Sequence, residues 1–220
     1  MAKDPSDLLD NTIQARILVM RHPETLGNVN NLYQGQSDSG LSVKGEAQCS
    51  QAVAAMIAWQ PDQVVTSPIG RCMRVSEAVG RFLSIDVERD NRLKELSFGA
   101  LEGLSDEEAQ QRGLSYKWDV APDEPAAPGA ETLTQFVTRV TRAADDIQNK
   151  KGRIAVVTHG GVIRVLFSHW LRMEQGLYWP LEVQNVDSAC FYVSTEETVF
   201  LERFGIKPEW LFSLNNTDRG

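Results

Sequence analysis

The stretch ILVMRHPET, residues 17–25, joins a run of four apolar residues to a charged turn. The same pattern occurs at residues 64–68, VVTSP, and at residues 154–161, IAVVTHGG. Short apolar runs that are rich in β-branched residues and lead into helical segments are typical of strands covered by helices on both faces. The three runs therefore predict an α/β fold with a mostly parallel central sheet.

Helical and strand patterns fill much of the remaining chain. Four segments have the apolar spacing of amphipathic helices: residues 43–59, 69–83, 132–148 and 161 to about 171. Two apolar runs predict further strands at residues 188–193 and 198–204, and Trp210-Leu211-Phe212 is expected to be a last apolar anchor.

Residues 97–129 show neither the apolar spacing of a helix nor the apolar run of a strand, and they contain an acidic stretch and a proline-rich loop. We expect this segment to cross one end of the sheet as a lid, with Tyr116 and Trp118 either forming a wall of the site or pinning the lid to the core. The chain is otherwise expected to form one domain over residues 16–214. Residues 1–15 and 215–220 are expected to be flexible.

The composition argues against several classes of protein. The 30 acidic residues exceed the 22 basic ones and give a formal net charge of −8, which argues against a nucleic-acid-binding surface. No apolar run approaches the ~20 residues of a membrane-spanning helix, and residues 1–14 carry no secretory signal. Cys49, Cys72 and Cys190 have no paired spacing, so we expect buried, reduced thiols in a cytoplasmic protein.

Charged and polar residues follow three of the predicted strands. Arg21 and His22 come directly after the first run, Arg71 follows Ser67 by one helical turn, and His159 follows the third run. Because ligands bind beyond the carboxyl ends of parallel strands, these side chains are expected to meet at one edge of the sheet. Two guanidinium groups and two imidazoles around one point match a compact dianion, above all a phosphoryl group.

The turn after His159 supports the same interpretation. Gly160 and Gly161 precede a predicted helix, so their main-chain N–H groups and the positive end of that helix can face a phosphate oxygen. No Walker loop or dinucleotide fingerprint is present. The three histidines, the third being His169, lack the spacing of zinc ligands, so we expect no metal and assign His169 a structural or surface role.

Phosphoryl transfer also needs a nucleophile, which histidine can supply, and a proton donor for the leaving oxygen. Glu95 is the expected acid because it lies at the mouth of the lid. Three other carboxyl groups are candidates. Glu24 is expected to be an N-terminal helix or turn carboxylate, Glu102 an exposed acid, and Glu131 a helix N-terminal charge.

The order of these motifs resembles the histidine phosphatase superfamily, also called the phosphoglycerate mutase-like family. Residues 21–25, RHPET, with Asn28 resemble its Arg-His-Gly-Glu-Thr signature and trailing Asn. Further matches follow in the family's order over about residues 16–170: Tyr33-Gln34-Gly35 with Asp38, Leu41-Ser42 with Gly45 and Ala47, Thr66-Ser67-Pro68 with Arg71, Glu95-Leu96 with Gly99 and Glu102-Gly103, Gly129 with Glu131, and Thr158-His159-Gly160-Gly161.

The resemblance implies a three-layer α/β/α, phosphoglycerate mutase-like fold and a two-step phosphoryl transfer that uses neither a metal ion nor another cofactor. His22 would be the nucleophile, and Glu95 would protonate the leaving alkoxide and then activate water. The remaining residues would hold the phosphate or the substrate: Arg21, Arg71 and His159 at the phosphate oxygens, with Asn28, Gln34, Gly35 and Gly160 around them.

Pro23 departs from the family pattern, which usually has glycine at this position. Proline removes a main-chain N–H and pushes the preceding residue, His22, toward extended geometry. We expect Pro23 to alter the fit of the substrate more than the mechanism.

The acidic lid favours a phosphatase over a mutase. Mutases of 3-phosphoglycerate in the family hold a second anionic group with basic residues from this region, whereas residues 97–129 contain only Arg112 and Lys117 as cations. We therefore predict hydrolysis of a small phosphomonoester. A phosphoglycerate mutase and a catalytically silent phosphate-binding module remain the alternatives.

Two further expectations concern conditions and assembly. A neutral His22 and a cationic His159 would place the optimum on the mildly acidic to neutral side, near the histidine pKa of about 6.5. An edge strand near the C-terminus could pair two chains into a homodimer.

Overall fold

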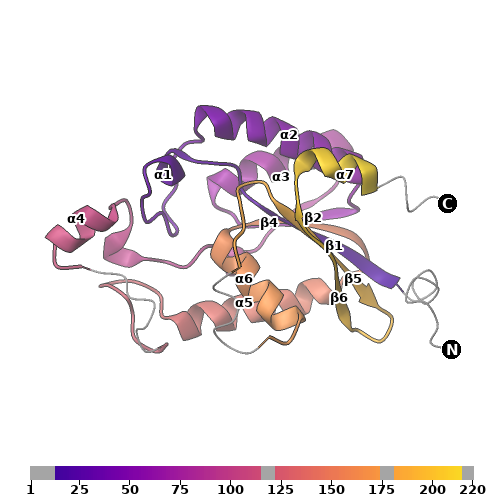
Figure 1. The fold of residues 1–220 in the computed structure, drawn as a ribbon. Helices are drawn as coiled ribbons and strands as arrows, with labels where there is room; N and C mark the ends of the chain where they lie inside the picture. The colour runs from indigo at the N-terminus through magenta and orange to yellow at the C-terminus, as the bar shows by residue number, and fades with distance from the viewer. Residues whose placement is uncertain (1–12, 115–121, 174–180, 215–220) are drawn as a thin grey trace.

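In a computed structural model, which describes residues 13–114, 122–173 and 181–214, a six-stranded sheet lies between two layers of helices (Figure 1). The strands are β1 Ile13–Arg21, β2 Gln63–Thr66, β3 Val87–Arg89, β4 Gly152–Thr158, β5 Ser188–Ser194 and β6 Val199–Ile206. Their order in the sheet is β3-β2-β4-β1-β5-β6. Strands β1 to β4 are paired in parallel, whereas β5 is antiparallel to both β1 and β6. The mostly parallel sheet expected from the sequence is confirmed.

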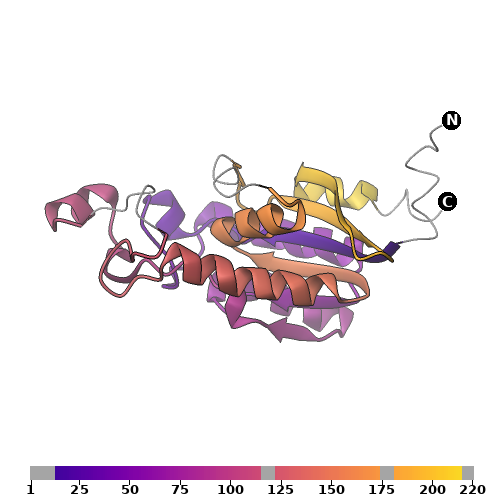
Figure 2. The ribbon, with the colours of Figure 1, turned by 90° about the horizontal axis from the view of Figure 1, so that it is seen from below.

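Helices cover both faces of this sheet. The longer ones are α2 Val43–Trp59, α3 Gly70–Leu83, α5 Leu133–Gln148, α6 Gly160–Trp170 and α7 Pro208–Leu214. Helices α2, α3 and α7 lie on one face, and α5 and α6 lie on the other (Figures 1 and 2). In β1, Ile17 and Val19 face one core, while Leu18 and Met20 face the other. The alternation of side chains along a strand explains why these runs are continuously apolar.

The helix boundaries follow from local chemistry. Ser42 begins α2, because its side chain accepts a hydrogen bond from the main-chain N–H of Gly45, and Thr132 begins α5 in a capping box with Gln135. The predicted helix at residues 43–59 has the same bounds as α2. The other three begin one residue away from the predicted start, and α3 and α5 end at the predicted residue.

The predicted excursion has some regular structure of its own. It contains the short helices η3 Gly99–Leu101 and α4 Asp106–Gln111, and its described parts pack around a small apolar cluster of Leu101, Leu104, Ala109 and Ala127. Figure 1 shows α4 far from the sheet. Tyr116, Lys117 and Trp118 lie outside the described residues.

Three expectations from the sequence need correction. Strand β1 begins at Ile13, so residues 13–15 belong to the sheet and not to a flexible extension. Strand β3 was not predicted; it is followed by the 3-10 helix η2 Asn91–Leu93. In the last apolar run only Leu211 is buried, while Trp210 is 58% and Phe212 is 48% exposed.

Candidate active site

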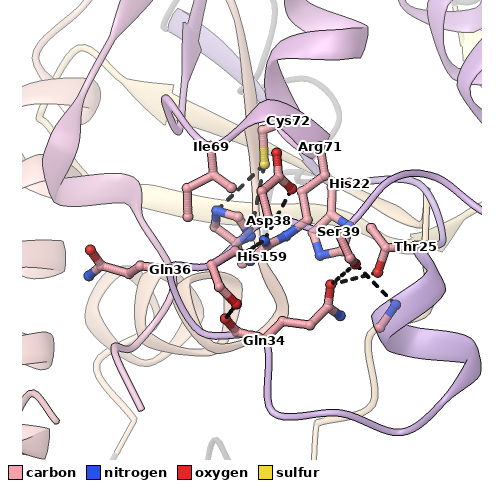
Figure 3. Close-up of polar contacts among 12 residues, drawn as sticks. His22, Thr25, Gln34, Gln36, Asp38, Ser39, Ile69, Arg71, Cys72 and His159 are labelled. Atoms are coloured by element: carbon pink, nitrogen blue, oxygen red, sulfur yellow. Dashed lines mark hydrogen bonds and ion pairs between the residues drawn. The ribbon is translucent and has the colours of Figure 1, made fainter. Parts of the chain in front are cut away.

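Four side chains meet at the carboxyl edge of the parallel strands. Arg21 is the last residue of β1, His22 and His159 follow β1 and β4, and Arg71 lies in the first turn of α3. The rings of His22 and His159 have centroids 5.3 Å apart, and Figure 3 shows both beside Arg71. A hydrogen bond of 2.9 Å from the main-chain N–H of His22 to the carbonyl of Thr158 joins the two strand ends. The structure thus brings together the residues that the sequence placed after separate strands.

The His22 ring is held in one orientation and in its neutral form. Its Nδ1–H donates to the carbonyl of Pro23 at 2.7 Å, which leaves the lone pair on Nε2. Burial, followed by the charges of Arg71 and Arg21, holds the pKa of His22 well below 6.5. Pro23 lacks an N–H but retains the carbonyl that orients this ring.

The two arginines each keep a donor for a ligand. Arg71 donates from Nη1 to the carbonyl of Ser37 and from Nη2 to that of Gly35, both at 2.7 Å, and Arg21 donates from Nη1 to the carbonyl of Val183 at 2.6 Å. Among the described residues, the buried Nε atoms of both arginines have no hydrogen-bond partner. Buried N–H groups are rarely left unpaired, so these two indicate a place for an anionic acceptor.

His159 is fully buried, and a hydrogen bond of 2.7 Å between its Nε2 and Ser67 Oγ joins the two residues. Its pKa lies well below 6.5, because of burial first and then the charges of Arg71, His22 and Arg21. The structure therefore favours a neutral His159 and not the cationic ring expected from the sequence. A bound phosphate dianion would oppose these causes and favour the protonated ring.

Glu95 lies at the first turn of α6. Its Oε2 accepts from the main-chain N–H of Gly161 at 3.0 Å and its Oε1 from that of Leu96 at 3.1 Å. A Cβ on residue 161 would overlap Oε1, which explains the need for glycine there. The N–H of Gly161 is therefore used by Glu95 and not left for a phosphate oxygen. Gly160 faces the site, because its Cβ position lies 3.6 Å from Arg21 Nε.

The residues predicted to hold the phosphate from residues 28–35 mostly contact other protein groups. Asn28 Oδ1 accepts from the main-chain N–H of Thr25. Gln34 Oε1 accepts from the hydroxyls of Thr25 and Ser39 (Figure 3). Gly35, with a φ of 51°, offers its carbonyl to Arg71. Gln34 and Gly35 thus hold other residues of the site in place.

Glu102 was expected to be an exposed acid, and that expectation is wrong. Its carboxylate accepts from the main-chain N–H groups of Gln36, Ser37 and Phe98 at 3.0, 2.8 and 3.0 Å. It therefore holds the loop that supplies both carbonyls to Arg71.

Glu131 does more than add a charge at a helix N-terminus. Its carboxylate is bound by Arg139 Nε and Nη2 at 2.6 and 2.8 Å. Arg139 in turn donates to the main-chain carbonyl of Glu95 at 2.9 Å. Glu24, by contrast, is the expected turn carboxylate, bound by Ser42 and Lys44, whose hydrogen bonds lower its pKa.

Asn185 is a site residue that sequence reasoning missed. It donates from Nδ2 to the main-chain carbonyl of His22 at 3.0 Å, across 163 positions of sequence. A single asparagine before a strand carries no periodic or motif signal that would have pointed to this contact.

The remaining candidates lie apart from the reacting groups or are inert. All three cysteines are unpaired and buried, and burial raises the pKa of Cys72, which lies 3.6 Å from His159 Nε2, to about 12. His169 of α6 pairs with Asp145 of α5 at 2.7 Å. Within the described ranges, no cluster of three or more His, Cys, Asp or Glu side chains could share a metal ion, and no helix is long and apolar enough to cross a membrane.

A histidine pair, the buried Arg71 and the half-buried Arg21 at the edge of a mostly parallel sheet define a phosphoglycerate mutase-like protein. The sequence profile of the histidine phosphatase superfamily, branch 1, matches residues 17–204, and the chain belongs to this family.

Relatives of the chain carry the names of both mutases and phosphatases. A protein of Erwinia tasmaniensis described as "Probable phosphoglycerate mutase GpmB" is 30% identical over 177 residues, which cover 77% of this chain and 81% of the relative. The alpha-ribazole phosphatase of Shigella flexneri shares the fold with a TM-score of 0.78 and 22% identity, over 87% of this chain and 96% of that one. A phosphoglycerate mutase of Bacillus anthracis has a TM-score of 0.71 and 22% identity, over 91% and 96%.

Proposed function

We propose that this protein hydrolyses small phosphomonoesters through a phosphohistidine on His22, without a metal ion or other cofactor. The observation that carries the proposal is the pair of buried, unpartnered Nε–H groups of Arg21 and Arg71 beside a neutral imidazole. Two fixed cationic donors next to an uncharged nucleophile suit an incoming phosphate dianion better than any other common ligand.

The first step forms the covalent intermediate. The lone pair of His22 Nε2 attacks phosphorus while the bond from phosphorus to the ester oxygen breaks. Glu95 gives its proton to the departing oxygen, so that the product leaves as a neutral alcohol. Arg21 and Arg71 hold the equatorial oxygens, where charge develops, and need no reorganisation to do so.

The second step releases phosphate. Glu95, now a carboxylate, takes a proton from a water molecule as that water attacks the phosphohistidine. The bond between phosphorus and Nε2 breaks, the electron pair returns to His22, and Glu95 again holds a proton. Each turnover therefore consumes one water and restores both residues.

The charge of the lid favours hydrolysis over the mutase reaction. In the described residues 97–114 and 122–129, Arg112 is the one basic residue, while six are acidic: Glu102, Asp106, Glu107, Glu108, Asp123 and Glu124. Such a segment is a poor clamp for a substrate with a second anionic group. The names of the curated relatives make phosphoglycerate mutase the second candidate.

Phosphate release from a panel of phosphomonoesters in EDTA, with p-nitrophenyl phosphate and 3-phosphoglycerate among them, tests the proposal. We expect turnover by the wild type, loss of turnover in His22→Ala, and retention in the control His169→Ala. Conversion of 3- to 2-phosphoglycerate without hydrolysis would identify a mutase. Neither activity, with phosphate binding intact, would identify a binding module.

A further inference from the structure

Residues 183–187, which we call the strap, directly precede β5 and lie against the carboxyl end of β1. The main-chain N–H of Arg21 donates to the carbonyl of Asp187, and the N–H of Val186 donates to the carbonyl of Arg21, both at 3.1 Å. The side chain of Arg21 donates to the carbonyl of Val183. The strap therefore fixes both the main chain and the side chain of a phosphate-binding arginine.

Asn185 extends this contact to the nucleophile. Its Nδ2 donates to the His22 carbonyl at 3.0 Å and lies 3.4 Å from Asn28 Oδ1. Both partners are acceptors, so the orientation of the Asn185 carboxamide follows from them. Asn28 Oδ1 already accepts from Thr25, which directs the nitrogen of the Asn28 carboxamide away from this group of donors.

Pro23 gives the Asn185 contact special weight. The peptide between residues 22 and 23 has no N–H, because residue 23 is proline, so its carbonyl is the one group through which a hydrogen bond can anchor it. Among the described residues, Asn185 donates the hydrogen bond to that carbonyl. The next carbonyl along the chain, that of Pro23, orients the His22 ring.

The main chain of the strap is strained at this point. Val186 is a buried, β-branched residue with a φ of 59°, in the left-handed region that such residues avoid. Strain of this kind persists where surrounding contacts determine the conformation, and it clusters at functional sites. Here the surrounding contacts are the hydrogen bond to Arg21 and the packing of the Val186 side chain in the core under α2 and α3.

We propose that Asn185 is the positioning residue of the nucleophile: it anchors the His22–Pro23 peptide and thereby aims the His22 imidazole at the bound phosphorus. The inference rests on the proposed phosphohistidine mechanism. Asn185 acts through His22 and does not hold the phosphate, so its loss should slow phosphoryl transfer and leave phosphate affinity nearly intact.

The variants Asn185→Ala and Asn185→Asp test this role with p-nitrophenyl phosphate, using inorganic phosphate as the binding probe. We expect kcat to fall on the order of 10- to 100-fold in both, because small misplacements of reacting groups have effects of this size. The inhibition constant of inorganic phosphate should stay within about threefold. The carboxylate of Asn185→Asp should also raise the His22 pKa and move the acid limb of kcat/KM to higher pH, which a merely structural role would not do.

Gln184→Glu is the matched control, because it makes the same amide-to-acid change at the exposed neighbouring residue. It should leave kcat, the acid limb and phosphate inhibition unchanged. Unchanged kcat in both Asn185 variants, or a loss of phosphate affinity as large as the loss of kcat, would overturn the inference while wild-type turnover upholds the proposed function. An inactive wild type would instead overturn the proposed function itself.

Discussion

Arg71 uses both terminal nitrogens of its guanidinium group on loop carbonyls and presents its Nε–H to the site. The two carbonyls lock the plane of the group, so it needs no rearrangement to meet a phosphate oxygen. Asp38 lies 3.6 Å away but is partly exposed, so it balances the charge without occupying the donor. The shape of the guanidinium group should therefore matter as much as its charge.

We expect Arg71→Lys to weaken inhibition by inorganic phosphate about 10- to 100-fold, although the positive charge remains. Lysine lacks the planar, forked set of N–H donors of the guanidinium group, and a hydrogen bond to a charged group is worth about 1.5–3 kcal/mol. Arg74→Lys is the control, because Arg74 lies on the same helix, is exposed and pairs with Glu46. Equal phosphate affinity in Arg71→Lys and the wild type would contradict the role of Arg71.

Pro23→Gly should preserve catalysis and lower stability. The variant keeps the carbonyl that accepts from His22, so kcat on p-nitrophenyl phosphate should stay within about threefold. The free energy of unfolding should fall by about 0.4–1 kcal/mol, because glycine gives the unfolded chain more freedom. The ranking of substrates across a panel of phosphomonoesters should change. An unchanged ranking would refute the effect on substrate fit, and a collapse of kcat would refute the role of the carbonyl.

Site residues whose charged or imidazole side chains follow a predicted strand could be predicted from the sequence. Site residues that act by binding main-chain groups could not. Arg21, His22, Arg71 and His159 are all of the former kind. Glu102 and Asn185 instead bind main-chain groups of segments far away in sequence. A carboxylate that accepts from amides has no spacing or residue-type signature, so its partners become visible only once the chain is folded.

Among the elements, α6 positions the proposed acid most directly. Its first turn gives the N–H of Gly161 to Glu95, and the positive end of the helix lies beside that carboxylate. Close approach is possible because residue 161 has no Cβ. The position of the Glu95 carboxyl group thus depends on Gly161, although α6 itself supplies no acidic side chain to the site.

Gly161→Ala should impair the step that needs a proton donor. The added Cβ overlaps Glu95 Oε1, so kcat/KM on an alkyl phosphate should fall about 10- to 100-fold, less than for a lost general acid because Glu95 is displaced and not removed. The loss should be smaller for p-nitrophenyl phosphate, whose leaving group departs without a proton. Gly40→Ala, at a residue with open space around it, is the control. Equal losses on both substrates would contradict the assignment of Glu95 as the acid.

Long elements could be predicted from the sequence more readily than short ones. Helix α2 has the predicted bounds because its helical pattern extends over seventeen residues. Strand β3 has three residues with one apolar side chain, at the edge of the sheet, so no alternation marks it. Helix α4 was also missed, although Ser105 and Glu108 form the capping box that could have revealed it.

At the scale of the whole molecule, the sheet order β3-β2-β4-β1-β5-β6 places β1 and β4 side by side although they are far apart in sequence. Periodicity predicted the strands, and the general rule for parallel sheets predicted their common edge. The order of the strands depends on packing between segments that are distant in sequence, so no local sequence pattern predicts it. The homodimer through the last edge strand stays a prediction, with β6 at that edge.

The two buried histidines should make stability depend on pH. Their folded-state pKa values lie well below 6.5, whereas in the unfolded chain both take the ordinary value. Below pH 6.5 the unfolded state therefore binds more protons, and the free energy of unfolding should fall by up to about 1.4 kcal/mol per pH unit for each histidine. Urea unfolding at pH 5.5 and 7.5 measures this difference. It should shrink in His159→Gln and persist in His169→Gln; an equal difference in all three proteins would contradict the buried, neutral state.

Detection of a phosphoryl group on His22 is the most direct test of the proposed mechanism. The enzyme is mixed with p-nitrophenyl phosphate, quenched in alkali, in which phosphohistidine is stable, and digested for mass spectrometry. We predict one phosphoryl group on the peptide that contains His22, and none in His22→Ala. Turnover with no phosphorylated histidine, or with the label on another residue, would contradict the phosphohistidine mechanism.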